Sequence, residues 1–278
     1  MSSPGPQTRP APPRARTVLL SKVPEITVGF WVAKALSTAL GESTSDYLVH
    51  RLGPYAAVFI GALTLLIGLA WQFSTRRYVA WVYWFAVIMV AISGTLAADA
   101  VHVGLGIPYV VSTVFYAFVL AAVFVVWQRT EGTLSIHSIT SVRRELFYWA
   151  AVLATFALGT AAGDMTAATL GWGYLSSGLF FGVVLLVPAI LYARTAISPV
   201  FLFWFAYVFT RPLGASFADW FGKDHHLGGL ALGDGPVSAV LAVAIMAVVA
   251  RLAYQSGTPR LQPAIAGEGD VPRRGRVS

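Results

Sequence analysis

The chain has 278 residues, of which 57% are hydrophobic and 11% are charged, and its mean hydropathy is +0.70. Because a soluble domain carries about 25% charged residues, this composition indicates an integral membrane protein in a lipid bilayer. The net charge of +7 does not predict a nucleic-acid partner, since it lies in short loops and tails around apolar segments, and the absence of cysteine excludes disulfides and thiolate metal sites.

Eight stretches are apolar over the roughly 20 residues that a spanning helix needs. They are expected at 25–48, 54–74, 79–102, 108–128, 146–169, 173–193, 199–221 and 236–254. They make up a transmembrane domain over 23–255, and the Pro/Gly/Arg-rich tails, 1–22 and 256–278, are expected to be disordered. A longer polar loop, Arg129 to Arg144, separates the two halves.

One spaced pattern recurs four times: an aromatic residue and Trp, then Gly after nine intervening residues, then Asp after four more. The copies are Phe30-Trp31, Gly41, Asp46; Tyr83-Trp84, Gly94, Asp99; Tyr148-Trp149, Gly159, Asp164; and Phe203-Trp204, Gly214, Asp219. Each copy opens one helical hairpin, which gives repeats at about 23–76, 77–130, 142–195 and 197–255. The predicted fold is all-α, with eight transmembrane helices as four parallel two-helix repeats in a pseudo-fourfold or paired pseudo-twofold bundle. The fourth copy also carries a seven-residue insertion.

The positive residues predict the orientation. Fifteen of the 19 Lys and Arg residues lie in or beside the tails and the connections on one side, whereas the other side has only Arg51 and Lys223. By the positive-inside rule, both termini are cytoplasmic and the number of spans is even. The repeat count and the charge distribution thus agree on eight spans.

Ionisable residues within the spans are costly, at about 2.5–3.5 kcal/mol each, and are functional candidates by default. The candidate ion-binding residues are Glu42, Asp46, Asp99, Asp164 and Asp219. A carboxylate at the C-terminal end of a helix opposes the helix dipole, so four equivalent Asp residues require an explanation. A site on the transport path is one explanation; solvated residues at the membrane surface, bonded to the backbone of a tight turn, are the other.

Two cations are the candidate counter-charges. Lys34 shares a helix face with Glu42 and Asp46, because these positions are spaced by multiples of four. Arg211 stands in mid-span directly before Pro212, which predicts a bent or broken helix with Arg211 paired to Glu42 or to a repeat Asp. The alternative is a purely structural ion pair between the first and last repeats.

Four histidines fall on the same side as the repeat Asp residues and form a weaker set of candidate metal ligands: His50, His102, His225 and His226. Imidazole and carboxylate together suit divalent transition metals. The Trp residue of each repeat is expected in an aromatic belt at the membrane interface.

Three stretches resemble a widespread family of uncharacterised bacterial polytopic membrane proteins, usually labelled "membrane-anchored protein". They are Lys22-Val-Pro-Glu-Ile-Thr with the first repeat, Thr-Leu-Ser-Ile-His-Ser-Ile at 133–139, and Thr-Arg-Pro-Leu-Gly-Ala at 210–215. The resemblance covers most of 22–255 and implies an eight-helix repeat protein of a bacterial inner membrane.

The leading functional hypothesis is cation transport, of a metal ion or coupled to protons, through the acidic residues of the odd-numbered helices. A non-transporting scaffold or regulatory protein with structural charges is the main alternative, and a transporter of a small organic metabolite is the third. No enzyme signature is present, so the sequence predicts a protein that is not an enzyme and has no cofactor, with a divalent metal ion as a candidate substrate. The sequence does not predict the oligomeric state.

Overall fold

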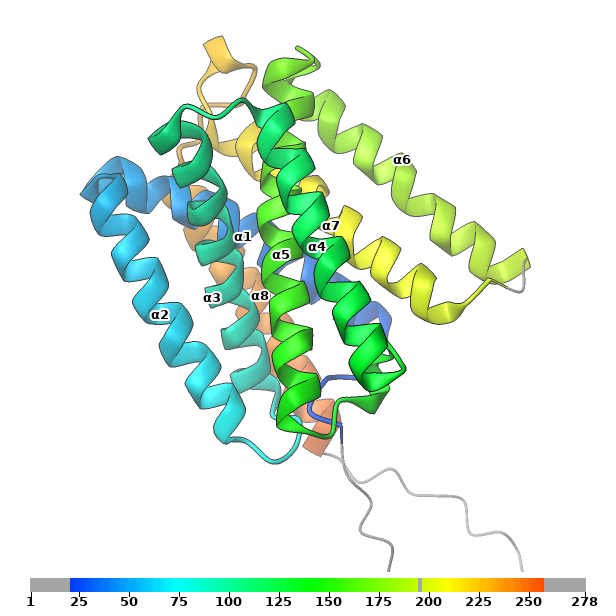
Figure 1. Cartoon of the computed structure of the whole chain (residues 1–278). Helices are drawn as coiled ribbons and strands as arrows, with labels where there is room; N and C mark the ends of the chain where they lie inside the picture. The colour runs from blue at the N-terminus through cyan, green and yellow to red at the C-terminus, as the bar shows by residue number, and fades with distance from the viewer. Residues whose placement is uncertain (1–20, 195–196, 258–278) are drawn as a thin grey trace, which may run out of the picture.

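The computed structural model describes residues 21–194 and 197–257, and these form eight long helices joined by short connections (Figure 1). The helices are α1 (Val28–Leu52), α2 (Pro54–Ser74), α3 (Ala80–Asp99), α4 (Tyr109–Glu131), α5 (Val142–Asp164), α6 (Gly173–Arg194), α7 (Pro199–Gly222) and α8 (Asp234–Gly257). The tails predicted to be disordered fall on 1–20 and 258–278, outside the described residues. Lys22, which was expected to be the last residue of the disordered first tail, lies within the described residues and is buried.

Local signals explain several helix ends. Thr27 caps α1 by accepting a hydrogen bond from the backbone N–H of Phe30, and Ser141 caps α5 in the same way. Pro54 and Pro199 stand in the first turn of their helices, where a missing N–H costs nothing. Gly132 ends α4 in the left-handed conformation, with φ of 72°.

Seven of the eight helices are long and apolar enough to cross a membrane, and no strand occurs among the described residues. The exception is α1, which carries Lys34, Glu42 and Asp46. Because α1 packs side by side with α3 and α7 within the bundle, it crosses with them. The predicted fold, an all-α polytopic membrane protein of four parallel two-helix repeats, is confirmed.

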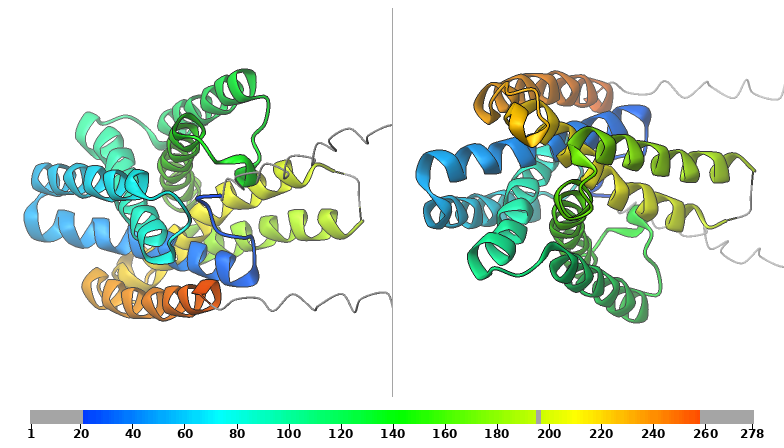
Figure 2. Two further views of the ribbon diagram at one scale, coloured as in Figure 1. Left: turned by 90° about the horizontal axis from the view of Figure 1, so that it is seen from below. Right: turned by 90° about the horizontal axis from the view of Figure 1, so that it is seen from above.

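The odd-numbered helices form an inner ring in the order α1, α3, α5, α7, and α7 closes the ring against α1. The even-numbered helices lie outside this ring (Figure 2). Each packs most extensively on the odd helix of the following repeat: α2 on α3, α4 on α5, α6 on α7, and α8 on α1. Because the outer helix of each repeat packs on the inner helix of the next, all the way round the ring, the bundle has pseudo-fourfold symmetry. The paired pseudo-twofold arrangement is not observed in the described helices.

The repeat glycines let the inner helices approach closely. A Cβ atom added to any of them would lie 1.9–2.6 Å from the side chain three residues before the glycine of the next repeat, and the last repeat faces the first. The pairs are Gly41 with Ala91, Gly94 with Phe156, Gly159 with Arg211, and Gly214 with Thr38. The spacing of the repeat therefore determines the register between neighbouring inner helices.

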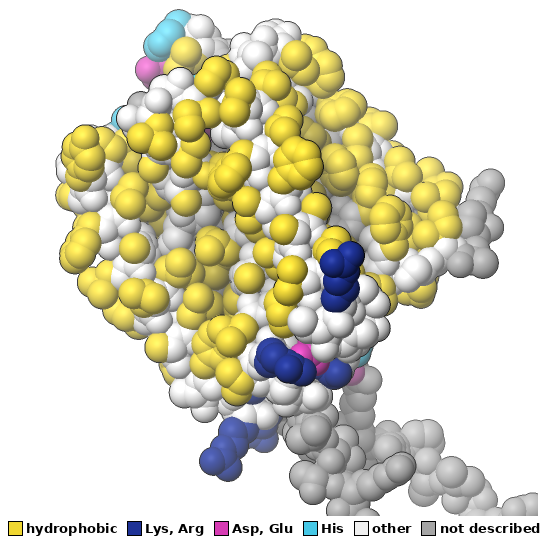
Figure 3. Space-filling view, viewed as in Figure 1, with side chains coloured by type: hydrophobic (Ala, Val, Ile, Leu, Met, Phe, Trp, Pro, Cys, Tyr) yellow, Lys and Arg dark blue, Asp and Glu magenta, His cyan; other side chains and the backbone are white. Residues whose placement is uncertain are grey.

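The outer surface suits a bilayer. Hydrophobic side chains cover the sides of the molecule, and the Lys and Arg side chains gather at the end where α1 begins and α8 ends (Figure 3). We call this the tail end, and we call the opposite end, where the repeat Asp residues lie, the acidic end. The even helices carry much of the exposed apolar surface, including Tyr55, Phe59 and Val240.

Three expectations need correction. The Arg129 to Arg144 loop is shorter than expected, because α4 continues to Glu131 and α5 begins at Val142, and its remaining residues include the buried Ile136 and Ile139. Of the bent or broken helix expected at Pro212, the break is excluded, since α7 runs from Pro199 to Gly222 with Pro212 inside it. The interfacial Trp belt is wrong for three of the four repeats: Trp84, Trp149 and Trp204 are buried against neighbouring inner helices.

Candidate functional site: a column of charged residues on the bundle axis

The guanidinium of Arg211 lies at the centre of the inner ring and is fully buried. Its Nη2 donates hydrogen bonds to Glu42 Oε2 at 2.6 Å, to Thr160 Oγ1 at 2.6 Å and to Thr95 Oγ1, while Nη1 donates to the Thr38 carbonyl oxygen at 3.4 Å. Arg211 from α7 thereby contacts α1, α3 and α5, and one buried cation connects all four repeats.

The repeat explains why these side chains meet. Glu42, Thr95 and Thr160 each directly follow the repeat glycine of their helix, and the fourth equivalent is Ala215. Because Ala215 is small and Arg211 precedes it by one helical turn, the long Arg211 side chain reaches the axis at the level of the other three. The four equivalent positions thus carry one acid, two hydroxyls and one alanine, and the guanidinium of Arg211 lies at their level.

A layer of carboxylates lies one helical turn closer to the acidic end. Carboxylate oxygens of Glu42, Asp46 and Asp219 lie within 4.8 Å of one another, and no other such group of three occurs among the described residues. Asp99 and Asp164 lie within electrostatic range of Glu42 and Asp46. The structure therefore brings three of the five predicted acidic residues into one group, and Asp99 and Asp164 are near enough to interact with it electrostatically.

The backbone changes where two of these acids stand. Directly after Asp99 and Asp164, helices α3 and α5 continue as π-helical turns, Ala100–Gly104 and Met165–Thr169. Such turns are rare and frequently occur at functional sites. Helices α1 and α7 carry no such turn after Asp46 and Asp219. The acidic layer therefore has two kinds of helix end, with α3 and α5 side by side on one half of the ring and α7 and α1 on the other.

Lys223 binds the acidic layer from the loop that follows α7. Its Nζ lies 2.5 Å from Asp46 Oδ2 and 3.7 Å from Asp219 Oδ1, and its side chain is 18% exposed. Burial by itself would lower the pKa of the Lys223 amine, but the carboxylates of Asp219 and Asp46 outweigh burial and raise the pKa. Lys223 is therefore a cation at neutral pH.

Lys34 lies two helical turns from Glu42 toward the tail end and is fully buried. Its Nζ makes no hydrogen bond within the described part of the chain. The Nζ lies 3.9 Å from the centroid of the Phe156 ring and 4.0 Å from that of Tyr207, an arrangement that stabilises a cation through the ring faces. The sequence places Lys34 on the polar stripe of α1, but its aromatic surroundings come from α5 and α7.

Aromatic side chains close the axis beyond Lys34. Each inner helix contributes the first aromatic residue of its repeat: Phe30, Tyr83, Tyr148 and Phe203. The hydroxyls of Tyr83 and Tyr148 share a hydrogen bond, and the ring centroids of Phe30 and Phe203 lie 6.1 Å apart. From the acidic end to the tail end, the axis thus carries carboxylates, Arg211, Lys34 and a closed aromatic layer.

The four candidate histidines do not join the carboxylate group. Nδ1 of His50 lies 2.9 Å from Asp234 Oδ2, and His225 donates to the backbone oxygen of Gly229. His102 donates to a backbone oxygen and stacks on a tyrosine ring, while His226 is exposed. The carboxylate group therefore offers oxygen ligands alone.

Ion pairs of Lys223 at the acidic end and of Lys22 at the tail end were not predicted from the sequence. Lys223 follows Asp219 by four residues, a spacing that indicates a pair on one helix face and was available from the sequence. At the tail end, Lys22 Nζ donates to Glu145 Oε2 at 2.6 Å, and Gln72 donates to the other oxygen at 3.0 Å. Lys22 lies 123 residues from Glu145 and Gln72 lies 73 residues from it, and no sequence signal connects these positions.

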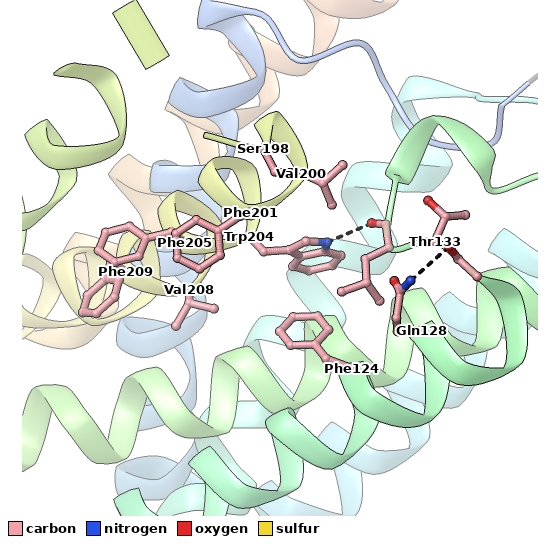
Figure 4. Close-up of a pocket in the computed structure, with 12 residues that line it drawn as sticks. Phe124, Gln128, Thr133, Ser198, Val200, Phe201, Trp204, Phe205, Val208 and Phe209 are labelled. Carbon is pink, nitrogen blue, oxygen red and sulfur yellow. Dashed lines mark hydrogen bonds between the residues drawn. The ribbon is translucent and has the colours of Figure 1, made fainter. Parts of the chain in front are cut away.

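A separate pocket of about 540 Å³ lies between α4, α7 and the loop before α5 (Figure 4). Its wall includes Trp204, whose Nε1 donates to the Leu134 carbonyl oxygen at 3.0 Å, and the rings of Phe205 and Phe209. None of the charged residues of the axis lines it. It is therefore distinct from the axial column.

Comparison with known protein families identifies the repeat. The family model described as "Repeat of Unknown Function (DUF347)" matches four times, at residues 29–78, 82–133, 147–198 and 202–258. No curated protein and no solved structure matches the chain. Each match covers one hairpin, so the family repeat is the structural unit of the bundle. With most of its length matched, the chain belongs to the family of membrane proteins built from this repeat of unknown function.

Proposed function

We propose that this protein transports a cation across the membrane along the axis of the inner ring, and that it is not an enzyme. The observation that carries the proposal is the convergence of the Glu42, Asp46 and Asp219 carboxylates within 4.8 Å at the acidic end. Carboxylates cost free energy inside a membrane, and rings of them attract cations into pores and transport sites. The positive-inside rule supports an orientation with the acidic end outside the cell and both termini in the cytoplasm.

Ligand type and charge favour a divalent ion that prefers oxygen ligands. The column contains five carboxylates and three side-chain cations, Lys34, Arg211 and Lys223. In the fully ionised state the excess is two negative charges, which one divalent ion balances. Mn²⁺, Mg²⁺ and Ca²⁺ all prefer carboxylate oxygens, whereas the histidines that would favour Zn²⁺ lie outside the group.

Transport requires the axis to open, because it is closed at two levels. Arg211 fills the centre of the ring, and the Tyr83 and Tyr148 layer closes the tail end. An ion that binds Glu42 competes with Arg211 for the same carboxylate. We therefore assign Arg211 and Lys34 the role of counter-charges that change partners as the ion passes.

The test is ion flux into liposomes that contain the purified protein. With Mn²⁺ as the probe, Asp46→Asn and Asp219→Asn are each expected to reduce flux at least tenfold. Asp224→Asn, which removes an exposed carboxylate at the same end, is the matched control and should leave flux unchanged. Equal flux in all four proteins would contradict the site assignment.

One observation favours a second function, a scaffold that does not transport. The hydrogen bonds of Arg211 join all four repeats, as a purely structural ion pair would. A scaffold predicts that no cation changes the thermal stability of the protein and that wild-type liposomes show no flux above empty ones. Cation-dependent stabilisation of the wild-type protein would exclude this reading.

A further inference from the structure

The segment that follows α7, residues 223–233, folds back on the end of that helix, and we call it the return loop. Its last residues donate backbone hydrogen bonds to α7 and to its own start: Leu230 to Trp220, Ala231 to Lys223, Leu232 to Phe221, and Gly233 to Gly222. The turn is tight, since a Cβ on Gly229 would lie 2.0 Å from the Lys223 carbonyl oxygen. This segment contains the seven-residue insertion that only the fourth repeat carries.

The return loop holds the Lys223 ammonium group in the carboxylate layer. Lys223 contacts Asp46 of the first repeat at 2.5 Å and Asp219 of the fourth at 3.7 Å. Its charge also acts at longer range on Asp99 and Asp164, which it does not contact. The carboxylate layer therefore already binds a cation, the ammonium group of Lys223.

A primary ammonium and a metal cation compete for the same carboxylate oxygens. Two of the three carboxylates that lie within 4.8 Å of one another, Asp46 and Asp219, are the two that Lys223 contacts. A metal ion bound there would meet the charge of Lys223 at close range, and that repulsion would displace the side chain. Since the loop is anchored by its backbone, the Lys223 side chain can leave while the loop stays in place.

We propose that Lys223 is a tethered cation that occupies the outer ion site between transport events, so that an incoming ion binds only by displacing it. This inference rests on the proposed function and adds a gate to it. The return loop sets the threshold: ions that bind carboxylates more weakly than the tethered amine does are excluded.

The test compares Lys223→Gln with the wild-type protein, using the purified full chain in detergent and MnCl₂ as the probe. Without Mn²⁺, Lys223→Gln should melt at a lower temperature, because the carboxylates lose their cation. Mn²⁺ should restore the melting temperature, and the apparent Kd should be at least tenfold lower than that of the wild type. Lys223→Arg keeps the charge and should bind Mn²⁺ no more tightly than the wild type.

Arg51→Gln is the matched control, because Arg51 is an exposed cation at the same end, and it should change neither quantity. If the wild type binds Mn²⁺ and Lys223→Gln binds it no more tightly, Lys223 is a structural ion-pair partner and the gate is contradicted while the proposed function stands. If Mn²⁺ and the other divalent ions stabilise neither protein, the proposed function fails together with the gate.

Discussion

Replacing Arg211 by Met is expected to lower the free energy of unfolding by about 3–5 kcal/mol, the usual cost of removing one partner of a buried ion pair. Glu42, which is 3% exposed, would lose its cationic partner, and the hydroxyls of Thr95 and Thr160 would lose a hydrogen-bond donor. Thermal unfolding of the purified protein in detergent measures the effect.

Removal of the opposite charge provides the internal control. In the double variant Arg211→Met with Glu42→Gln, the unpaired carboxylate is gone, so the loss should be smaller than the sum of the two single losses. Arg144→Met offers a comparison at an ion pair nearer the surface, where 29% of the Arg144 side chain is exposed and the loss should stay below about 1 kcal/mol. Additive losses for Arg211 and Glu42 would show that the two residues do not act as a pair.

Replacing Lys34 by Met is expected to have the opposite effect and to raise the free energy of unfolding by about 1–2 kcal/mol. A buried lysine costs about 2.5–3.5 kcal/mol on the insertion scale, and the faces of Phe156 and Tyr207 return only part of this. Because Lys34 has no carboxylate partner among the described residues, its removal leaves no charge unpaired.

The Lys34→Met variant also distinguishes an effect on stability from an effect on transport. If Lys34 is a counter-charge that changes partner during transport, Lys34→Met should lower Mn²⁺ flux at least tenfold while it raises the melting temperature. Lys22→Met is the comparison: Lys22 is paired with the buried Glu145, so that variant should destabilise the protein. Destabilisation by Lys34→Met as well would mean that the ammonium contributes to folding and would contradict its assignment as an unpaired charge.

Much of the fold follows from the sequence because membrane helices obey simple rules. Length and hydropathy located the eight helices, with their ends displaced by a few residues, and the fourfold pattern gave the hairpins. The sequence left open which helices pack together. Each even helix packs mainly on the next repeat, since the repeat glycines set the contacts of the inner ring and the outer helices cover the grooves between its members.

The site was predictable in part. The four repeat Asp residues stand at equivalent positions after the repeat glycines, and that regularity indicated that they would lie at one end of the bundle. The role of Lys223 depends on how the return loop folds, which the Asp219 spacing suggests but does not determine. The prediction of an interfacial Trp belt was wrong for three repeats, because Trp is enriched at the interface on helices that face lipid. Trp84, Trp149 and Trp204 belong to the inner ring, where protein side chains surround them.

The central claim is that Asp46 and Asp219 bind a cation, and the most direct test is thermal unfolding of the purified protein over a range of Mn²⁺ concentrations. A ligand that binds only the folded state raises the melting temperature in a saturable way. We expect such a rise for the wild type and for Asp224→Asn, and its loss in the double variant Asp46→Asn with Asp219→Asn. The same rise in the double variant, or none in the wild type with any divalent ion, would contradict it.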